Sequence, residues 1–199
     1  MDARNRLKKI LVTRCLQIGH FELTSGRSSP YYLDAKKATL DPEGAYLCAR
    51  LILEELKSQD ITAVAIGGLS LGADPIVSAV AVVSFVERER FNPLPAFIVR
   101  KRAKPHGTRR YLEGYHGPEK APVAVVDDVS TTGGSAQKAI LQAEAEGYQV
   151  VAVISIVDRE EGAEENLARY RFIPLFRASE LLADPRIQEQ LAQMPPLHP

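Results

Sequence analysis

The spacing of apolar residues predicts a helix at the start of the chain and alternating strands and helices after it. Residues 2–18 show helical periodicity, with apolar positions at Leu7, Ile10, Leu11, Cys15 and Ile18. A second helix is expected from Pro42, which suits a first helical turn, to about Ser58. Further on, the pattern predicts strands near 62–66, 95–100, 123–127 and 149–157, helices near 74–86 and 134–146, and a last strand and short helix within 169–182. This alternation favours a mainly parallel sheet with helices on both faces.

The chain length and the remaining segments indicate one domain with a small appended flap. A chain of 199 residues can bury a substantial core as a single unit. Residues 21–44 mix Gly, Ser and Pro with aromatic residues, which is typical of irregular strands and turns. We therefore expect an N-terminal helix and flap over 1–44, an α/β core over 45–185 and a tail over 186–199.

Charge and composition argue against several classes of protein. The formal net charge is zero, so no general attraction to nucleic acid or to an anionic membrane is expected. The only two cysteines, Cys15 and Cys48, are not spaced as metal ligands, and the histidines are scattered, which argues against a zinc site held by the protein. No apolar run reaches the length of a membrane span, and the charged N-terminal segment is unlike a signal peptide, so we expect a cytoplasmic location.

Residues 123–140 are the most informative stretch. An apolar strand ends in two carboxylates, Asp127 and Asp128, and a turn of small residues then leads into a helix. Backbone N–H groups at a helix start bind phosphate, and carboxylates accept hydrogen bonds from ribose hydroxyls, so the pattern predicts a sugar phosphate as ligand. The P-loop of nucleoside triphosphatases requires a Lys after its last glycine, whereas this chain has Ser135 there, so the segment is not a P-loop. The alternative is a helix start that is capped for structural reasons only.

A second feature is a cluster of positive charge between residues 100 and 110. This stretch contains six Lys and Arg residues and no acidic residue. It opens a segment of about twenty residues without apolar periodicity, and loops of that length in compact domains are often functional. We expect a mobile cationic lid that closes over a pyrophosphate and excludes water. A solvated charge run or a nucleic-acid patch is the alternative.

Four candidate loops each follow a predicted strand, at residues 67–72, 100–107, 127–134 and 157–162. Since ligands of parallel α/β sheets bind at the carboxyl ends of the strands, the fold is expected to bring these loops to one edge.

The segment VVDDVSTTGGS, residues 125–135, resembles the signature of the type I phosphoribosyltransferases, which use 5-phosphoribosyl 1-pyrophosphate (PRPP). The resemblance implies a mainly parallel sheet flanked by helices, with a small N-terminal flap or hood. It also implies that Asp127 and Asp128 bind the ribose hydroxyls. The turn that holds the 5-phosphate would comprise Val129, Ser130, Thr131, Thr132, Gly133, Gly134 and Ser135.

The spacing RKxxKxHG in residues 100–107 is similar to the catalytic loop of the orotate phosphoribosyltransferases in particular. This resemblance implies that orotate and PRPP are converted to orotidine 5-phosphate and pyrophosphate. It assigns the pyrophosphate to Arg100, Lys101, Lys104 and His106, partly across the interface of a homodimer, and to a loop that contains Leu71 and Gly72. Lys101, Lys104 and His106 are then the catalytic candidates, together with Asp127 and Asp128; His106 as a proton donor is an alternative role.

The orotate side of the site is implied by two further matches. FELTSGRSSPYY, residues 21–32, resembles the family's flap, and Arg159 in VDREEG matches an arginine that binds orotate. A guanidinium suits the carboxylate of orotate. The expected orotate-binding residues are Arg159, Thr131, Thr132, Arg27, Thr24, Tyr31 and Tyr32. The alternative for Arg159 is a surface ion pair with Glu160 or Glu161.

The resemblance also has departures and consequences for metal binding. Thr24 and Leu71 stand where some members of the family carry lysines, and Lys36 or Lys37 at the end of the flap is a candidate replacement. Mg²⁺ is the expected cofactor, bound largely through substrate oxygens and in part by Asp127 and Asp128.

Two rival functions stay open at this point. One is a phosphoribosyltransferase for another base, which should lack the loop at 100–107 and Arg159. The other is a regulator that senses PRPP and binds nucleic acid, although the chain leaves no room for a helix-turn-helix domain.

Overall fold

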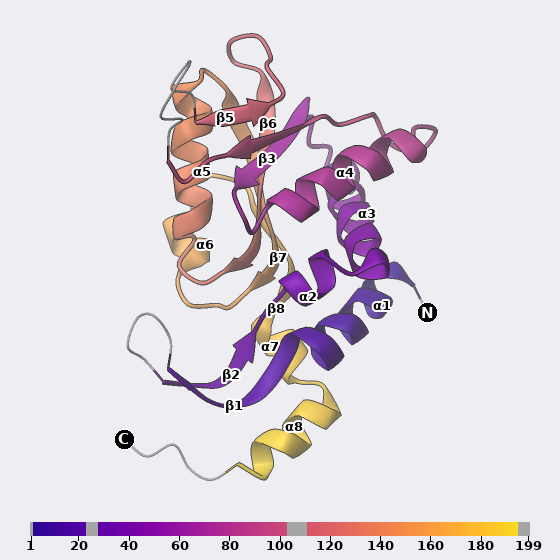
Figure 1. Cartoon of the computed structure of the whole chain (residues 1–199), viewed down its shortest axis with the longest axis vertical. Helices are drawn as coiled ribbons and strands as arrows, with labels where there is room; N and C mark the ends of the chain where they lie inside the picture. The colour runs from indigo at the N-terminus through magenta and orange to yellow at the C-terminus, as the bar shows by residue number, and fades with distance from the viewer. Residues whose placement is uncertain (1, 23–27, 103–110, 195–199) are drawn as a thin grey trace.

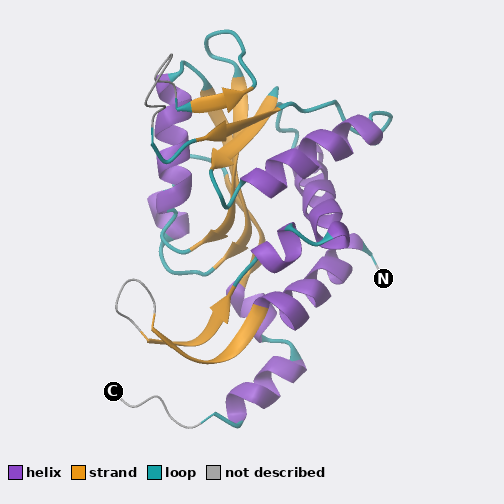
Figure 2. Ribbon diagram, viewed as in Figure 1, coloured by secondary structure: helices purple, strands orange, loops and turns teal. Residues whose placement is uncertain are grey.

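The computed structural model describes residues 2–22, 28–102 and 111–194 of the chain. Its centre is a six-stranded sheet with helices on both faces, and a two-stranded hairpin extends from one end (Figure 1, Figure 2). The sheet has the order β5-β4-β3-β6-β7-β8. Its strands are β3 (Ala65–Leu69), β4 (Ala96–Val99), β5 (Leu112–Gly114), β6 (Pro122–Ser130), β7 (Gln149–Asp158) and β8 (Phe172–Arg177).

All neighbouring strands of this sheet run parallel except β4 and β5, which pair antiparallel. The mainly parallel sheet that the alternating pattern predicts is therefore confirmed. The edge strand β5 lies within the segment for which the sequence predicts no regular element. Its three residues are too few to produce a detectable periodicity.

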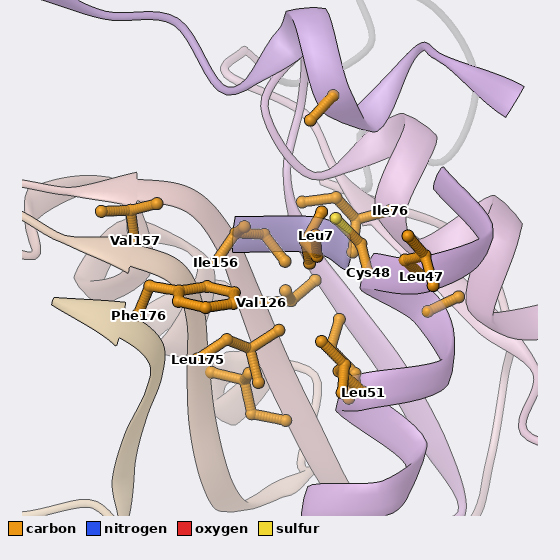
Figure 3. Close-up of a cluster of buried hydrophobic side chains, with 14 of the residues drawn as sticks. Leu7, Leu47, Cys48, Leu51, Ile76, Val126, Ile156, Val157, Leu175 and Phe176 are labelled. Carbon is orange, nitrogen blue, oxygen red and sulfur yellow. The ribbon is translucent and has the colours of Figure 1, made fainter. Parts of the chain in front are cut away.

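Helices α3 (Pro42–Ser58) and α4 (Asp74–Val86) cover one face of the sheet, and α5 (Gly134–Ala145) covers the other (Figure 1). The alternation of β6 explains how both faces are buried. Ala124 and Val126 belong to the cluster with the N-terminal helices, whereas Val123 and Val125 belong to the cluster with α5. Figure 3 shows Val126 of the first cluster beside Leu7 and Cys48. The predicted bounds of α3 and α4 are confirmed. The starts of both helices were predictable because each has a proline in its first turn.

The prediction of one helix over residues 2–18 is wrong in its last part. Helix α1 (Ala3–Ile10) continues as a π-helical segment, η1 (Leu11–Cys15), and strand β1 (Leu16–Glu22) follows immediately. β1 pairs antiparallel with β2 (Ser28–Leu33), and these two strands form the flap. Leu16 and Ile18 fit a period of two as well as a helical period, and pairing with β2 decides between them.

Other element boundaries also differ from the sequence prediction. The strand expected near 62–66 is β3, whose pattern the sequence obscures because Gly67 and Gly68 lie inside it. Within the region expected to be a tail, helix α8 (Pro185–Ala192) begins at a proline after the Asp184 cap. The remaining short helices are α2 (Lys36–Thr39), α6 (Ala163–Asn166) and α7 (Ala178–Leu182).

Helix α2 joins the flap to α3, and its backbone is fixed by close packing. The Asp34 N–H donates to the Cys15 carbonyl over 3.0 Å, and Asp34 Oδ1 accepts from the Lys36 N–H. Gly44 of α3 lies against the backbone of Ala38, where a Cβ would collide with the carbonyl oxygen. A residue without a side chain is therefore required at position 44 for α2 to lie in its observed place.

We expect Gly44→Ala to lower the free energy of unfolding by about 1 to 3 kcal/mol, because the clash is with backbone and cannot be relieved by a side-chain rotation. Denaturant unfolding measures this loss. Gly134→Ala is the control, since its Cβ would meet its nearest neighbour, Thr132 Oγ1, only at 3.8 Å. Equal stability of the two variants would contradict the packing described for α2.

Candidate active site at the carboxyl end of the sheet

The carboxyl ends of β3, β4, β6 and β7 lie at one edge of the sheet, as the sequence predicts for the loops that follow them. The Ser70 N–H after β3 donates to the Val99 carbonyl at the end of β4 over 2.9 Å. The Arg159 N–H after β7 donates to the Ser130 carbonyl at the end of β6 over 2.8 Å. The parallel direction of these strands places all four carboxyl ends together, which is where α/β sheets bind ligands.

Asp127 and Asp128, near the end of β6, are both buried at this edge. The Asp128 N–H donates to Asp127 Oδ1 over 3.2 Å, and the Val129 N–H donates to Asp128 Oδ1 over 3.0 Å. Asp127 is only 5% exposed, and burial, followed by the neighbouring charge of Asp128, raises its pKa to about 7. The pair therefore carries less than two negative charges near neutral pH.

Lys36 supplies the counter-charge of this pair. Its Nζ donates to Asp128 Oδ2 over 2.9 Å, and this hydrogen bond raises the pKa of the lysine. Lys37 is exposed, and its side chain has no hydrogen bond or ion pair with any residue in the described ranges. Of the two lysines that the sequence offered as replacements, the structure brings Lys36 to the site.

The loop between β3 and α4 packs directly on Asp128. A Cβ at Gly72 would lie 2.6 Å from Asp128 Oδ1, so only glycine allows this close approach. Leu71, one residue earlier, is exposed, and the peptide bond between Ser70 and Leu71 is cis. The loop thus presents backbone and an apolar side chain here, without a cation.

The turn between β6 and α5 presents backbone donors. Gly133 has a φ of 77°, which favours glycine, and α5 begins at Gly134 without a side-chain cap. The Thr132 carbonyl is held by Asn166 Nδ2 over 3.0 Å, while the side chains of Thr132 and Ser135 are exposed. An uncapped helix start with free N–H groups is a site for an anion such as phosphate.

Arg159 connects this edge to the flap. Its side chain is 6% exposed, its Nε donates to Glu161 Oε1 over 2.8 Å, and its guanidinium carbon lies 4.5 Å from the Tyr31 ring centroid. A further N–H donates to Ser29 Oγ over 3.4 Å. The ion pair with Glu161 that the sequence offered as an alternative exists, but its arginine is buried and its glutamate is only partly exposed. Of the two flap tyrosines, Tyr31 is buried and Tyr32 is exposed.

The cationic stretch begins beside the pyrophosphate-loop candidate. The Arg100 Nη1 atom lies 3.5 Å from Glu113 Oε1 of β5, and the Lys101 side chain is exposed. Lys104 and His106 of this stretch, and Thr24 and Arg27 of the flap, lie outside the described residues.

Sequence reasoning missed one acidic residue at this edge. Asp74 opens α4, and its Oδ1 is buried without a hydrogen-bond partner in the described structure; burial raises the pKa of Asp74, an effect that the Lys101 charge partly offsets. Its position directly after the glycine-bounded loop was the available signal. The sequence offers Glu161 as a partner of Arg159, but only in a surface ion pair, because a sequence does not show burial.

The metal expected from the sequence has few protein ligands available. The described ranges contain no cluster of three or more His, Cys, Asp or Glu side chains that could enclose an ion. The two carboxylates of Asp127 and Asp128 suit Mg²⁺ when a ligand supplies the remaining oxygens.

In the described ranges, no helix is both long and apolar enough to cross a membrane.

The raised pKa of Asp127 predicts a pH-dependent stability. The folded protein keeps a proton on Asp127 up to about pH 7, whereas the unfolded chain releases it near the usual value of 3.8. This group therefore destabilises the fold progressively as the pH rises from about 4 to 7. The free energy of unfolding of Asp127→Asn, relative to that of wild type, should be higher at pH 8 than at pH 4 by at least about 1 kcal/mol. Denaturant unfolding at the two pH values measures this difference. A stability difference between variant and wild type that is the same at both pH values would contradict the raised pKa of Asp127.

Comparisons with known proteins agree with this architecture. No protein-family model matches the chain. It is 49% identical to the orotate phosphoribosyltransferase of Nostoc sp. over 81% of this chain and 76% of that protein. It is 43% identical to that of Aquifex aeolicus over 92% of this chain and 99% of that protein.

Solved structures agree as well. The orotate phosphoribosyltransferase of Mycobacterium tuberculosis in complex with Fe(III) dicitrate superposes with a TM-score of 0.78 at 35% identity, covering 90% of this chain and 99% of that one. The same enzyme in complex with PRPP gives a TM-score of 0.73 at 31% identity, with the same coverage. The fold is the type I phosphoribosyltransferase fold, and the chain belongs to the orotate phosphoribosyltransferase family.

Proposed function

We propose that the chain transfers the phosphoribosyl group of PRPP to orotate, yielding orotidine 5-phosphate and pyrophosphate in pyrimidine nucleotide synthesis. The observation that carries this proposal is the buried carboxylate pair near the end of β6, followed at once by the uncapped start of α5. The carboxylates offer acceptors for ribose hydroxyls, and the helix start offers backbone donors for the 5-phosphate. Family membership supports the same reaction.

The donor would bind along the edge of the sheet. Asp127 and Asp128 hold the ribose hydroxyls, and the turn from Val129 to Ser135 holds the 5-phosphate. The pyrophosphate lies toward the loop of Leu71 and Gly72 and toward the cationic stretch of Arg100, Lys101, Lys104 and His106. Adjacency supports this arrangement, because Gly72 packs directly on Asp128.

Orotate would bind between the flap and the loop after β7. Arg159 is the candidate partner of its carboxylate, and Thr131 and Thr132 lie in the adjoining turn. The contact of Arg159 with Tyr31 and Ser29 supports this position, because it connects the flap to the edge that holds the ribose. To bind orotate, the guanidinium has to share donors with, or leave, Glu161.

The reaction breaks the bond between the anomeric carbon and the pyrophosphate oxygen and forms a bond from that carbon to the orotate ring nitrogen. The proton of that nitrogen is released to the departing pyrophosphate or to water. Positive charge develops on the sugar, next to the Asp127 and Asp128 carboxylates. The departing negative charge develops next to Lys101, Lys104 and His106, so positioned electrostatics supply most of the acceleration. Mg²⁺, when bound, would neutralise charge on the pyrophosphate, with Asp127 and Asp128 as its protein ligands.

The loss of orotate absorbance on mixing protein, Mg²⁺ and PRPP tests this proposal. Turnover is expected with orotate and not with adenine, uracil or hypoxanthine. Lys104→Ala should lower kcat by roughly 100-fold or more, as for the loss of one donor to a developing charge. Lys138→Ala on the exposed face of α5 is the matched control and should behave as wild type. Turnover with another base and not with orotate would contradict the orotate assignment. No turnover with any of the four bases would favour a regulator that senses PRPP and binds nucleic acid.

We further propose that the chain acts as a homodimer in which the catalytic loop is shared across the interface. An apolar strip on α4 supports a buried partner surface, because Val82, Phe85 and Val86 are each more than half exposed and lie at helical spacing. The single-domain division of the chain and its cytoplasmic location stay predictions.

Phe85→Glu should convert the dimer to a monomer, because a carboxylate would be buried in an apolar contact. Light scattering during gel filtration measures the mass. Leu141→Glu, an equally exposed apolar position on α5, is the control and should remain dimeric. A monomeric wild type would contradict the dimer, and a dimeric Phe85→Glu would contradict this interface.

A further inference from the structure

Lys36 is the described cation nearest to the ribose site, yet it lies far from the site motifs in sequence. Its Nζ is 2.9 Å from Asp128 Oδ2. The ammonium has three donors, of which one is used by this carboxylate. The side chain remains 48% exposed, whereas its partner carboxylate is largely buried. Lys36 can therefore contact a ligand on Asp128 without leaving its present position.

The position of Lys36 relates it to the pyrophosphate loop. Gly72 lies so close to Asp128 that a Cβ there would meet Oδ1 at 2.6 Å, and Lys36 donates to Oδ2 of the same carboxylate. The ammonium and the end of this loop thus lie on either side of a single carboxylate group. A pyrophosphate bound at Gly72 would therefore lie close to the lysine.

Charge gives a reason for a cation at this point. A pyrophosphate carries several negative charges, and here it would approach two neighbouring carboxylates. Neither residues 69–73 nor residues 131–135 contain a Lys or an Arg, and Leu71 in particular is exposed and apolar. The β3 loop itself offers backbone amides as donors. Among the side chains that the structure describes in contact with Asp127 and Asp128, Lys36 is the cation that would oppose their repulsion of a pyrophosphate.

The backbone around Lys36 is anchored. Its own N–H donates to Asp34 Oδ1 over 3.1 Å, and Asp34 is tied to the Cys15 carbonyl. Gly44 fixes the other end of the helix against α3. Because the backbone is anchored and the side chain is already paired with Asp128, little further ordering is needed when Lys36 binds a ligand.

We propose that Lys36 binds the pyrophosphate group of the phosphoribosyl donor and supplies the cation that this chain lacks at Leu71. The proposal rests on the function proposed above and adds a donor-binding residue from outside the family motifs. A different role is possible for a lysine in this place, namely positioning Asp128 for the ribose. The two roles predict different ligand dependence, because pyrophosphate contains no ribose and orotidine 5-phosphate contains no pyrophosphate.

The test compares three variants by calorimetric titration with each of these ligands in magnesium buffer. Lys36→Met removes the charge at similar length, Lys36→Arg retains it, and Lys37→Met removes the neighbouring exposed charge. We expect Lys36→Met to weaken pyrophosphate binding by about tenfold or more and to change orotidine 5-phosphate binding by less than about threefold. Lys36→Arg should recover most of the pyrophosphate affinity, and Lys37→Met should match wild type.

The KM for PRPP should rise in Lys36→Met, while the KM for orotate stays unchanged. An equal loss for both ligands would mean that Lys36 only positions Asp128, and no loss would mean that it binds neither; both outcomes overturn the inference. A wild-type protein that binds neither ligand and shows no turnover would instead overturn the proposed function. The two failures are therefore distinguishable.

Discussion

Two adjacent carboxylates buried near the end of the central strand β6 are the constraint on which the rest of the site depends. Buried charges are costly when unpaired, and two of the same sign in contact are worse. The protein meets this cost in three ways: Asp127 has a raised pKa, Asp128 accepts from the Val129 N–H, and Lys36 provides a counter-charge. The flap, the β3 loop and the start of α5 are arranged around this pair.

The parallel sheet explains why these parts can serve one ligand. Carboxyl ends of neighbouring strands lie side by side, so β3, β4, β6 and β7 each deliver a different chemistry to one edge. Under the proposed function, the backbone amides and cations would bind the pyrophosphate and the 5-phosphate. The carboxylates would bind the ribose hydroxyls, and the buried guanidinium would bind a base that carries a carboxylate. The hairpin of β1 and β2 adds the last surface through the contact of Tyr31 and Ser29 with Arg159.

The sequence predicts best what is encoded locally. The strand, turn and helix of residues 123–140 are a contiguous pattern, and prolines at 42 and 75 mark two helix starts. What it could not predict depends on distant partners. β1 begins at Leu16 because it pairs with β2, although its apolar spacing also fits a helix. Gly67 and Gly68 conceal β3, since glycine is unfavourable in a strand.

The same limit applies to the site. The motif residues Asp127 and Asp128 are evident in the sequence, but the state of their charge follows from burial. The sequence does not distinguish Lys36 from Lys37 as the replacement for the absent lysines. The packing of α2 against α3 brings Lys36 to Asp128. Likewise, a sequence cannot tell a buried pair of Arg159 and Glu161 from an exposed one.

A crystal structure of the protein with bound PRPP tests the central claim most directly. The account predicts the ribose hydroxyls within hydrogen-bond distance of Asp127 and Asp128, and the 5-phosphate on the backbone amides between Thr131 and Ser135. Binding of the phosphoribosyl group away from this edge of the sheet, with the carboxylate pair left without a sugar contact, would contradict it.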